Sequence, residues 1–161
     1  MARTFDHATP DAGLAEMKSL LGRAILAATE AQSRKRLSGT KEIFLTDIRR
    51  IEAGPRLSEA LIYGDRIYTS GFVAETMAGK SVLEQTRDIL QQIDAVLARA
   101  GSDKTRILKT NIWLSDIATF DEMNKAWEEW VVAGQTPVRA TVEAKLAEPC
   151  YAVEIMIEAV I

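Results

Sequence analysis

Apolar and polar residues alternate along much of the chain after residue 43, with the period of two that is typical of half-buried strands. The alternation is clearest in residues 136–143 and 151–157, near the C-terminus. Arg139 shares one face of the first segment with Thr141, and Glu154 lies opposite the apolar residues of the second. Further strands are predicted over residues 43–51, 59–63, 67–72 and 107–114. A tight turn at Gly64 predicts a hairpin.

Two other segments have helical periodicity. Each opens with the spacing of a capping box, Ser81 with Glu84 in the first and Thr119 with Glu122 in the second. Each segment then carries an apolar stripe and is predicted to end at a glycine, a residue that commonly follows the last turn of a helix. The stripe of the second helix contains Phe120, Met123, Trp127, Trp130 and Val131.

The predicted order of elements is β-β-β-α-β-α-β-β, which indicates an α+β fold with a mixed sheet. Two helices can cover only one face of that sheet. The other face would be a large exposed apolar patch, so we expect subunits to associate through it. Three or more subunits are required if the sheets close into a barrel-like centre, and a face-to-face dimer stays open as the alternative.

The first 42 residues follow a different pattern. Residues 13–31 have the apolar stripe of an amphipathic helix, and a basic run at residues 32–36 leads into a linker. We interpret residues 1–42 as an N-terminal extension, a solvated accessory arm, and residues 43–161 as the domain.

Composition narrows the class of protein. The length of 161 residues suits one domain, and no apolar run approaches the roughly 20 residues of a membrane span. The start has no apolar signal core, and a single cysteine allows no intrachain disulfide. These features predict a cytoplasmic protein that does not bind membranes. The net charge of −3 gives no reason to expect a nucleic-acid partner.

The scarcity of histidine and cysteine restricts the chemistry further. The one histidine is His7 and the one cysteine is Cys150, so no catalytic triad, Cys-His pair or histidine-rich metal site is predicted. Glycine-rich nucleotide motifs are absent as well, and we expect no cofactor. The remaining candidate is Arg139, whose planar fork suits a small carboxylate. The alternative is that Arg139 and Glu154 form a cross-strand ion pair.

Several short motifs recur in one order along the chain. They are Leu57-Ser58-Glu59-Ala60, Tyr68-Thr69-Ser70-Gly71, Gln85-Thr86, Ile93-Asp94-Ala95-Val96-Leu97, Ala100-Gly101-Ser102-Asp103-Lys104, Met123-Asn124-Lys125-Ala126-Trp127, Pro137-Val138-Arg139-Ala140-Thr141-Val142 and Val153-Glu154-Ile155. Together they resemble the reactive-intermediate deaminase family, also called the YjgF/YER057c/UK114 family, and within it the YoaB-like branch. The resemblance covers residues 43–161.

The resemblance implies a chorismate-mutase-like homotrimer with a site in each cleft between subunits. It implies that Arg139 binds the carboxylate of a 2-imino or enamine acid and that Glu154 positions or activates the attacking water. Ser70, Gly71 and Asn124 match other site positions of the family. No metal or cofactor is implied.

Two positions differ from the family pattern. Leu57 stands where the deaminases have a site tyrosine, and Thr141 stands where many have a cysteine; backbone groups of Thr141 can still contact a substrate. Two hypotheses follow. The first is an enzyme, a deaminase that releases ammonia and a 2-oxo acid. The second is a non-catalytic trimer that binds a small carboxylate metabolite or a protein partner.

Overall fold

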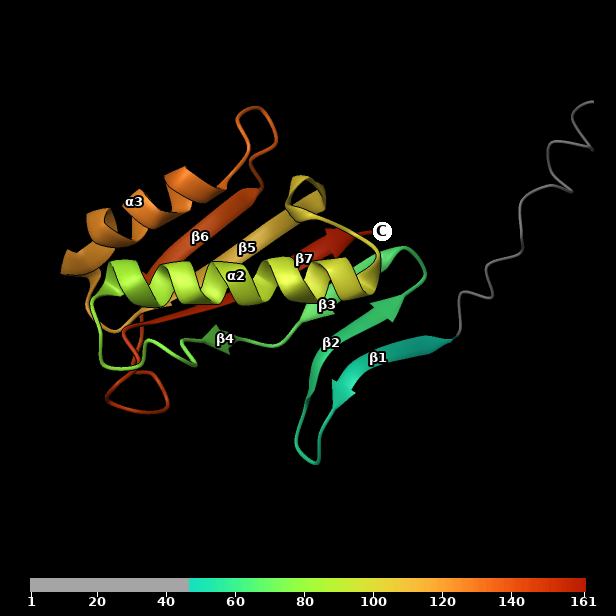
Figure 1. Ribbon diagram of the computed structural model, residues 1–161, viewed down its shortest axis with the longest axis horizontal. Helices are drawn as coiled ribbons and strands as arrows, with labels where there is room; N and C mark the ends of the chain where they lie inside the picture. Colours follow the sequence, from blue (N-terminus) through green and yellow to red (C-terminus); the bar gives the residue numbers. More distant parts are fainter. Residues whose placement is uncertain (1–46) are drawn as a thin grey trace, which may run out of the picture. The chain divides into compact units, whose positions relative to one another are not determined.

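The computed structural model describes residues 47–161, which form one sheet with two helices (Figure 1). The predicted helix over residues 13–31, the linker after it and the start of the first predicted strand lie outside the described residues. The strands are β1 Ile48–Ala53, β2 Ser58–Tyr63, β3 Arg66–Thr69, β4 Phe72–Val73, β5 Ile107–Leu114, β6 Val138–Glu143 and β7 Val153–Val160. The helices are α2 Val82–Ala100 and α3 Phe120–Trp130, with short 3-10 turns η1 Lys104–Arg106 and η2 Ile117–Thr119.

The sheet is mixed, as predicted. Its strand order is β1-β2-β3-β7-β5-β6, and β4 pairs with the first part of β7. Only β5 and β6 are parallel among the paired strands. The predicted hairpin is confirmed: Tyr63 pairs with Arg66, and Gly64 has the positive φ of 63° that a tight turn requires.

The predicted strand over residues 67–72 is divided in two at Ser70 and Gly71. Pairing between β3 and β7 stops before this point, where the Thr69 hydroxyl accepts a hydrogen bond from the Ile157 amide at 3.0 Å. The Ser70 amide turns instead to the Glu59 carbonyl, at 2.9 Å. The chain then rejoins β7 as β4, beside Glu154.

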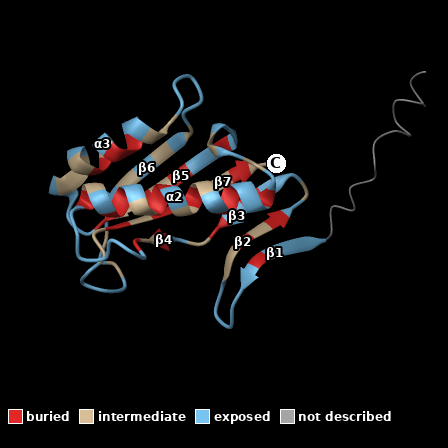
Figure 2. Cartoon of the chain, viewed as in Figure 1, coloured by how far each residue is buried: buried red, intermediate tan, exposed pale blue. Residues whose placement is uncertain are grey.

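Helix α2 begins and ends as the sequence predicts. The Ser81 hydroxyl accepts from the Glu84 amide, the Glu84 carboxylate accepts from the Ser81 amide, and Gly101 follows with a left-handed φ of 87°. The buried residues of α2, drawn red in Figure 2, recur along the helix with the spacing of one stripe. The helix therefore packs against the sheet by the expected face.

The capping box predicted for α3 is wrong. Thr119 belongs to η2, makes no cap bond, and donates its hydroxyl to the Asp116 carbonyl at 2.6 Å. Glu122 accepts instead from the amide of Leu83 at 3.0 Å, so it caps the other helix. The helix also ends at Trp130, before Gly134. A preceding 3-10 turn gives Thr119 a φ of −89° and ψ of 10°, which directs its hydroxyl away from the helix start.

Both helices lie on the same face of the sheet (Figure 1), and the core fills the space between them. Ile67, Ile112 and Ile155 point into that core and are at most 1% exposed. No described element covers the other face, as predicted. Apolar side chains occupy much of this open face: Leu61, Tyr63, Tyr68, Trp113, Val138, Val142 and Met156.

Candidate functional site

Arg139 lies on β6, at the edge of the sheet, and its side chain points toward α3. Its guanidinium carbon is 5.2 Å from the ring centre of Trp127 and 5.7 Å from that of Phe120. Nη1 also lies 4.0 Å from the sulfur of Met123. These three α3 residues are spaced by three and four positions, so they project from one face of the helix. The guanidinium is thus held against an aromatic wall by cation–π contacts.

No acidic side chain of residues 47–161 pairs with this guanidinium. Among the ion pairs of residues 47–161, none includes Arg139. Partial burial lowers the pKa of Arg139 below its usual value, and the charge of Glu128 offsets part of that effect. An arginine stays protonated under such conditions. Its hydrogen-bonding fork is therefore partly stripped of water and lacks a carboxylate from the described chain.

Asn124 and Thr141 share the surroundings of Arg139. Asn124 lies one turn after Phe120 and one turn before Trp127, so it projects from the same face of α3. Thr141 follows Arg139 on the same face of β6, with its hydroxyl buried and without a hydrogen-bond partner among the described residues. We refer to Arg139, Asn124, Thr141, Phe120 and Trp127 as the Arg139 cluster.

Glu154 and Gly71 form a second group. A Cβ atom built on Gly71 would lie 1.9 Å from Oε1 of Glu154 and 2.8 Å from its Cδ. Glu154 is half-buried and pairs with Val73 of β4 and Trp113 of β5. Ser70, next to Gly71, donates its hydroxyl to the Glu59 carbonyl at 3.3 Å. We refer to Ser70, Gly71 and Glu154 as the Glu154 cluster.

The two clusters lie on opposite faces of the sheet. Thr141 and Ile155 both pair with Ile112, which points toward the helices, so Arg139 also lies on the helix-covered face. Glu154 alternates with Ile155 and therefore belongs to the open face. Strand β5 also lies between β6 and β7, so the alternative of a cross-strand ion pair between Arg139 and Glu154 is wrong.

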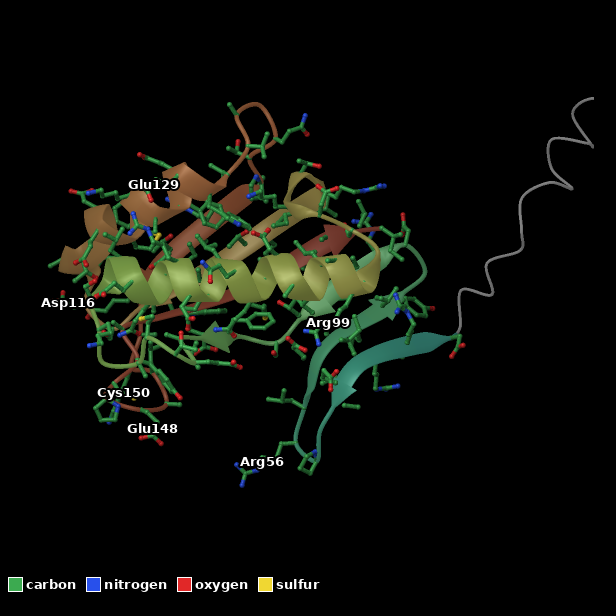
Figure 3. All side chains as sticks on the ribbon, in the orientation of Figure 1. Arg56, Arg99, Asp116, Glu129, Glu148 and Cys150 are labelled. Atoms are coloured by element: carbon green, nitrogen blue, oxygen red, sulfur yellow. The ribbon has the colours of Figure 1, made fainter. Side chains whose placement is uncertain are left out.

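Leu57 lies in a third place. It ends the connection between β1 and β2, where its carbonyl accepts from the Gly54 amide at 2.8 Å. Its side chain is 61% exposed. Figure 3 shows the neighbouring Arg56 at the tip of this connection, directed away from the sheet. The hollow that Leu57 lines, together with Gly54, Pro55 and Glu59, includes no residue of either cluster.

Other candidate chemistry is sparse in the described part of the chain. Residues 47–161 hold no group of acidic, histidine or cysteine side chains suited to a metal ion. No helix among them is long and apolar enough to cross a membrane. A hollow of about 730 Å³ lies under the connection from β6 to β7, but its lining includes none of the predicted site residues.

The aromatic wall was predicted only as part of a core stripe. The spacing of Phe120, Met123 and Trp127 correctly indicated one helix face, but it gave no sign that this face meets a cation. That contact depends on the parallel pairing of β6 with β5, a long-range feature. The sequence signal that could have indicated this contact is an arginine at the start of a strand that follows a tryptophan-rich helix.

Comparison with known proteins agrees with this fold. The family model described as Endoribonuclease L-PSP matches residues 43–161, and the chain belongs to that family. The RutC family protein YoaB of Escherichia coli is 47% identical over 112 residues, which cover 70% of this chain and 96% of that protein. A crystal structure of NMB1025 from Neisseria meningitidis, a YjgF protein family member, has a TM-score of 0.70 at 47% identity and covers 72% of this chain and 96% of that one.

A more distant relative is the chloroplastic Reactive Intermediate Deaminase A of Arabidopsis thaliana. It is 29% identical over 106 residues, which cover 63% of this chain and 56% of that protein. The resemblance inferred from the short motifs, to the YjgF family and its YoaB-like branch, is thus confirmed.

Proposed function

We propose that the protein hydrolyses reactive 2-imino or enamine acids to 2-oxo acids and ammonia, at sites formed between subunits of a cytoplasmic homotrimer. The observation that carries this proposal is the partly dehydrated guanidinium of Arg139, which pairs with no acidic side chain in the part of the chain that the structure describes. Such a group binds a carboxylate through two parallel, charge-assisted hydrogen bonds. The name of the Arabidopsis relative supports the reaction class.

The separation of the two clusters supports an assembly of subunits. Arg139 faces α3 at the sheet edge, whereas Glu154 belongs to the open face, so a site that uses both needs more than one chain. The exposed apolar residues of the open face, such as Val138 at 70% and Val142 at 50%, supply a surface for subunit contact. In this proposal each site takes the Arg139 cluster from one subunit and the Glu154 cluster from another.

The chemistry needs no histidine, metal or cofactor. Arg139 holds the substrate carboxylate, and Asn124 and Thr141 offer polar groups next to it. The carbon of the C=N bond is already electrophilic, so an oriented water can attack it. Glu154 accepts a proton from that water and passes it to the imine nitrogen, which gives a tetrahedral carbinolamine. Glu154 then transfers the hydroxyl proton of the carbinolamine to the nitrogen, which leaves as ammonia while the C=O bond of the 2-oxo acid forms.

Ammonia release tests the reaction. Imines are generated in solution by an amino-acid oxidase, and the purified full-length protein is added. We expect ammonia release faster than in buffer, with most of the gain lost in Arg139→Ala and in Glu154→Gln. A matched control is Arg106→Ala, because Arg106 is an exposed arginine of η1, outside the strands and both clusters. Rates equal to buffer with the unmodified protein would refute the proposed reaction.

A second candidate is a trimer that binds small carboxylates without turning them over. Leu57 favours it, because the deaminases that this chain resembles have a tyrosine hydroxyl at that position. Calorimetry with a 2-oxo acid separates the two candidates. Saturable, Arg139-dependent binding together with ammonia release at the buffer rate would support the binder.

The family model's description also names an endoribonuclease. The net charge of −3 does not favour a polyanionic substrate. We therefore propose a small carboxylate as the partner, and no nucleic acid.

Light scattering tests the assembly and should give a mass three times the 17.8 kDa of one chain. A mass equal to that of one chain would contradict both the assembly and the shared site.

A further inference from the structure

Three polar side chains of α2 point at the backbone that carries the Glu154 cluster. Gln85, Asp88 and Gln92 follow one another by three and four positions, so they share a side of the helix. Polar residues on the sheet-facing side of an amphipathic helix require hydrogen-bond partners. Gln92 donates one bond to Asp88 itself, and the other side-chain partners lie in two segments, residues 73–80 before the helix and residues 150–152 before β7.

Asp88 holds the segment that follows β4. Its Oδ2 accepts from the amides of Glu75 and Thr76 at 2.7 and 3.1 Å, and its Oδ1 accepts from the Thr76 hydroxyl at 2.6 Å. Gln92 adds a bond from its Nε2 to the Val73 carbonyl at 3.0 Å. Together they attach β4 and the residues after it to the helix.

Gln85 holds the chain that enters β7. It is fully buried, and its Nε2 donates to the carbonyls of Lys80 and Cys150 at 2.9 and 3.1 Å. Its Oε1 accepts from the Ala152 amide at 2.9 Å. Both the nitrogen and the oxygen of the Gln85 side-chain amide are thus hydrogen-bonded. One of the groups that they bind, the Ala152 amide, lies two residues before Glu154.

We propose that Gln85, Asp88 and Gln92 are positioning residues that set the contact between Gly71 and Glu154. Gly71 lies just before β4 and Glu154 lies just after the Gln85 anchor, so α2 fixes the backbone on both sides of the contact. The carboxylate has little free space, because it lies against the Gly71 backbone. A small shift of either segment therefore moves the carboxylate, and displacements near 1 Å are enough to slow a reaction about a hundredfold.

The inference rests on the proposed function for its kinetic consequence but not for its structural one. Asp88→Asn tests it, because the variant keeps only one, uncharged side-chain oxygen in place of two charged ones, which weakens the hydrogen bonds from the Glu75 and Thr76 amides. The matched control is Asp103→Asn: Asp103 accepts from the Thr105 amide at 2.8 Å and from the Thr105 hydroxyl at 2.5 Å, a similar tether remote from Glu154 in the chain. Gln92→Met serves as a second test variant if Asp88→Asn folds poorly.

Two readouts decide the outcome. In the ammonia assay we expect Asp88→Asn and Gln92→Met to lower kcat about tenfold or more while KM, which depends on Arg139, changes little, and Asp103→Asn to match the parent. In carbon-13 NMR, we expect the carboxyl signal of Glu154 to shift in the two test variants only.

The NMR readout separates failure of the inference from failure of the proposed function. An unchanged Glu154 signal in folded Asp88→Asn and Gln92→Met overturns the positioning role, even if the parent protein releases ammonia. A shifted signal in a protein without turnover supports the positioning role and refutes the reaction. Equal kcat losses in Asp103→Asn would also contradict the inference, because they would indicate a general loss of stability.

Discussion

The carboxylate of Glu154 occupies the space that a side chain on Gly71 would need. The built Cβ would lie 1.9 Å from its Oε1, far inside contact distance, while φ at Gly71 is not in the left-handed region. The glycine is therefore required by the close approach of the carboxylate, and not by backbone conformation. It follows that residue 71 controls where the carboxylate of Glu154 lies.

Gly71→Ala should displace that carboxylate while leaving the fold intact. The methyl group meets the flexible end of a half-buried side chain, so we expect a loss of about 1–2 kcal/mol in the free energy of unfolding. Ammonia release should fall by more than tenfold. Denaturant unfolding and the ammonia assay measure the two effects. Combining Gly71→Ala with Glu154→Ala removes the clash, so the double variant should be no less stable than Glu154→Ala alone; additive losses would show that the clash involves something else.

Arg139→Lys should lose carboxylate binding although it keeps the charge. An ammonium group cannot form the two parallel bonds of a guanidinium, and it stacks less well on Phe120 and Trp127. Since a hydrogen bond to a charged group contributes about 1.5–3 kcal/mol, we expect the Kd for a 2-oxo acid to rise about ten- to hundredfold. Calorimetry measures it, with Arg106→Lys as the control, because Arg106 is exposed and lies outside the strands. An unchanged Kd in Arg139→Lys would mean that the ligand binds elsewhere.

Most of the fold was predictable because its signals are local. Alternation and the Ser81 capping box identified the strands and α2, and the turn at Gly64 identified the hairpin. The uncovered face of the sheet was predicted because two helices can cover only one of its faces. The division at Ser70 and Gly71 is less visible in the sequence, because it depends on Thr69 bonding to Ile157, a residue far along the chain.

The candidate site was predicted as a set of residues but not as an arrangement. The sequence indicated faces within each strand, so Arg139 with Thr141 was correct. It could not indicate that β5 lies between β6 and β7, nor the register that places Glu154 beside Trp113 on the other face of the sheet. The contacts of Asp88 and Glu122 were missed for the same reason, since both side chains bond to segments distant in sequence.

Glu122 should stabilise the protein by capping the helix next to its own. Its Oε1 accepts from the Leu83 amide at 3.0 Å, a partly buried donor in the first turn of α2. Glu122→Ala leaves that donor unpaired, so we expect a loss of about 1–2 kcal/mol in denaturant unfolding. Asp121→Ala is the control, because Asp121 is an exposed acidic residue in the same first turn of α3. Glu122→Gln should retain most of the stability, because its side-chain oxygen can still accept from the Leu83 amide. Equal losses of stability in Glu122→Ala and Asp121→Ala would instead assign the effect to the dipole of α3.

Asp88 should make the stability of the fold depend on pH. Desolvation raises its pKa, but the hydrogen bonds from Thr76 and from the amides of Glu75 and Met77 together outweigh that effect, so the folded-state pKa lies below its ordinary value of 3.8. A lowered pKa means that the unfolded chain binds the proton more tightly. The stabilisation is therefore present above the unfolded pKa and is lost as the pH falls through the folded one.

The comparison of the parent protein with Asp88→Asn isolates this contribution. Glu84 and Asp103 also have lowered pKa values, but they are the same in both proteins and cancel in the difference. We expect the parent to be the more stable of the two at pH 7, and the difference in the free energy of unfolding to shrink below about pH 4. Denaturant unfolding from pH 2 to pH 7 measures it. A difference that stays constant with pH would show that the Asp88 hydrogen bonds do not depend on its charge.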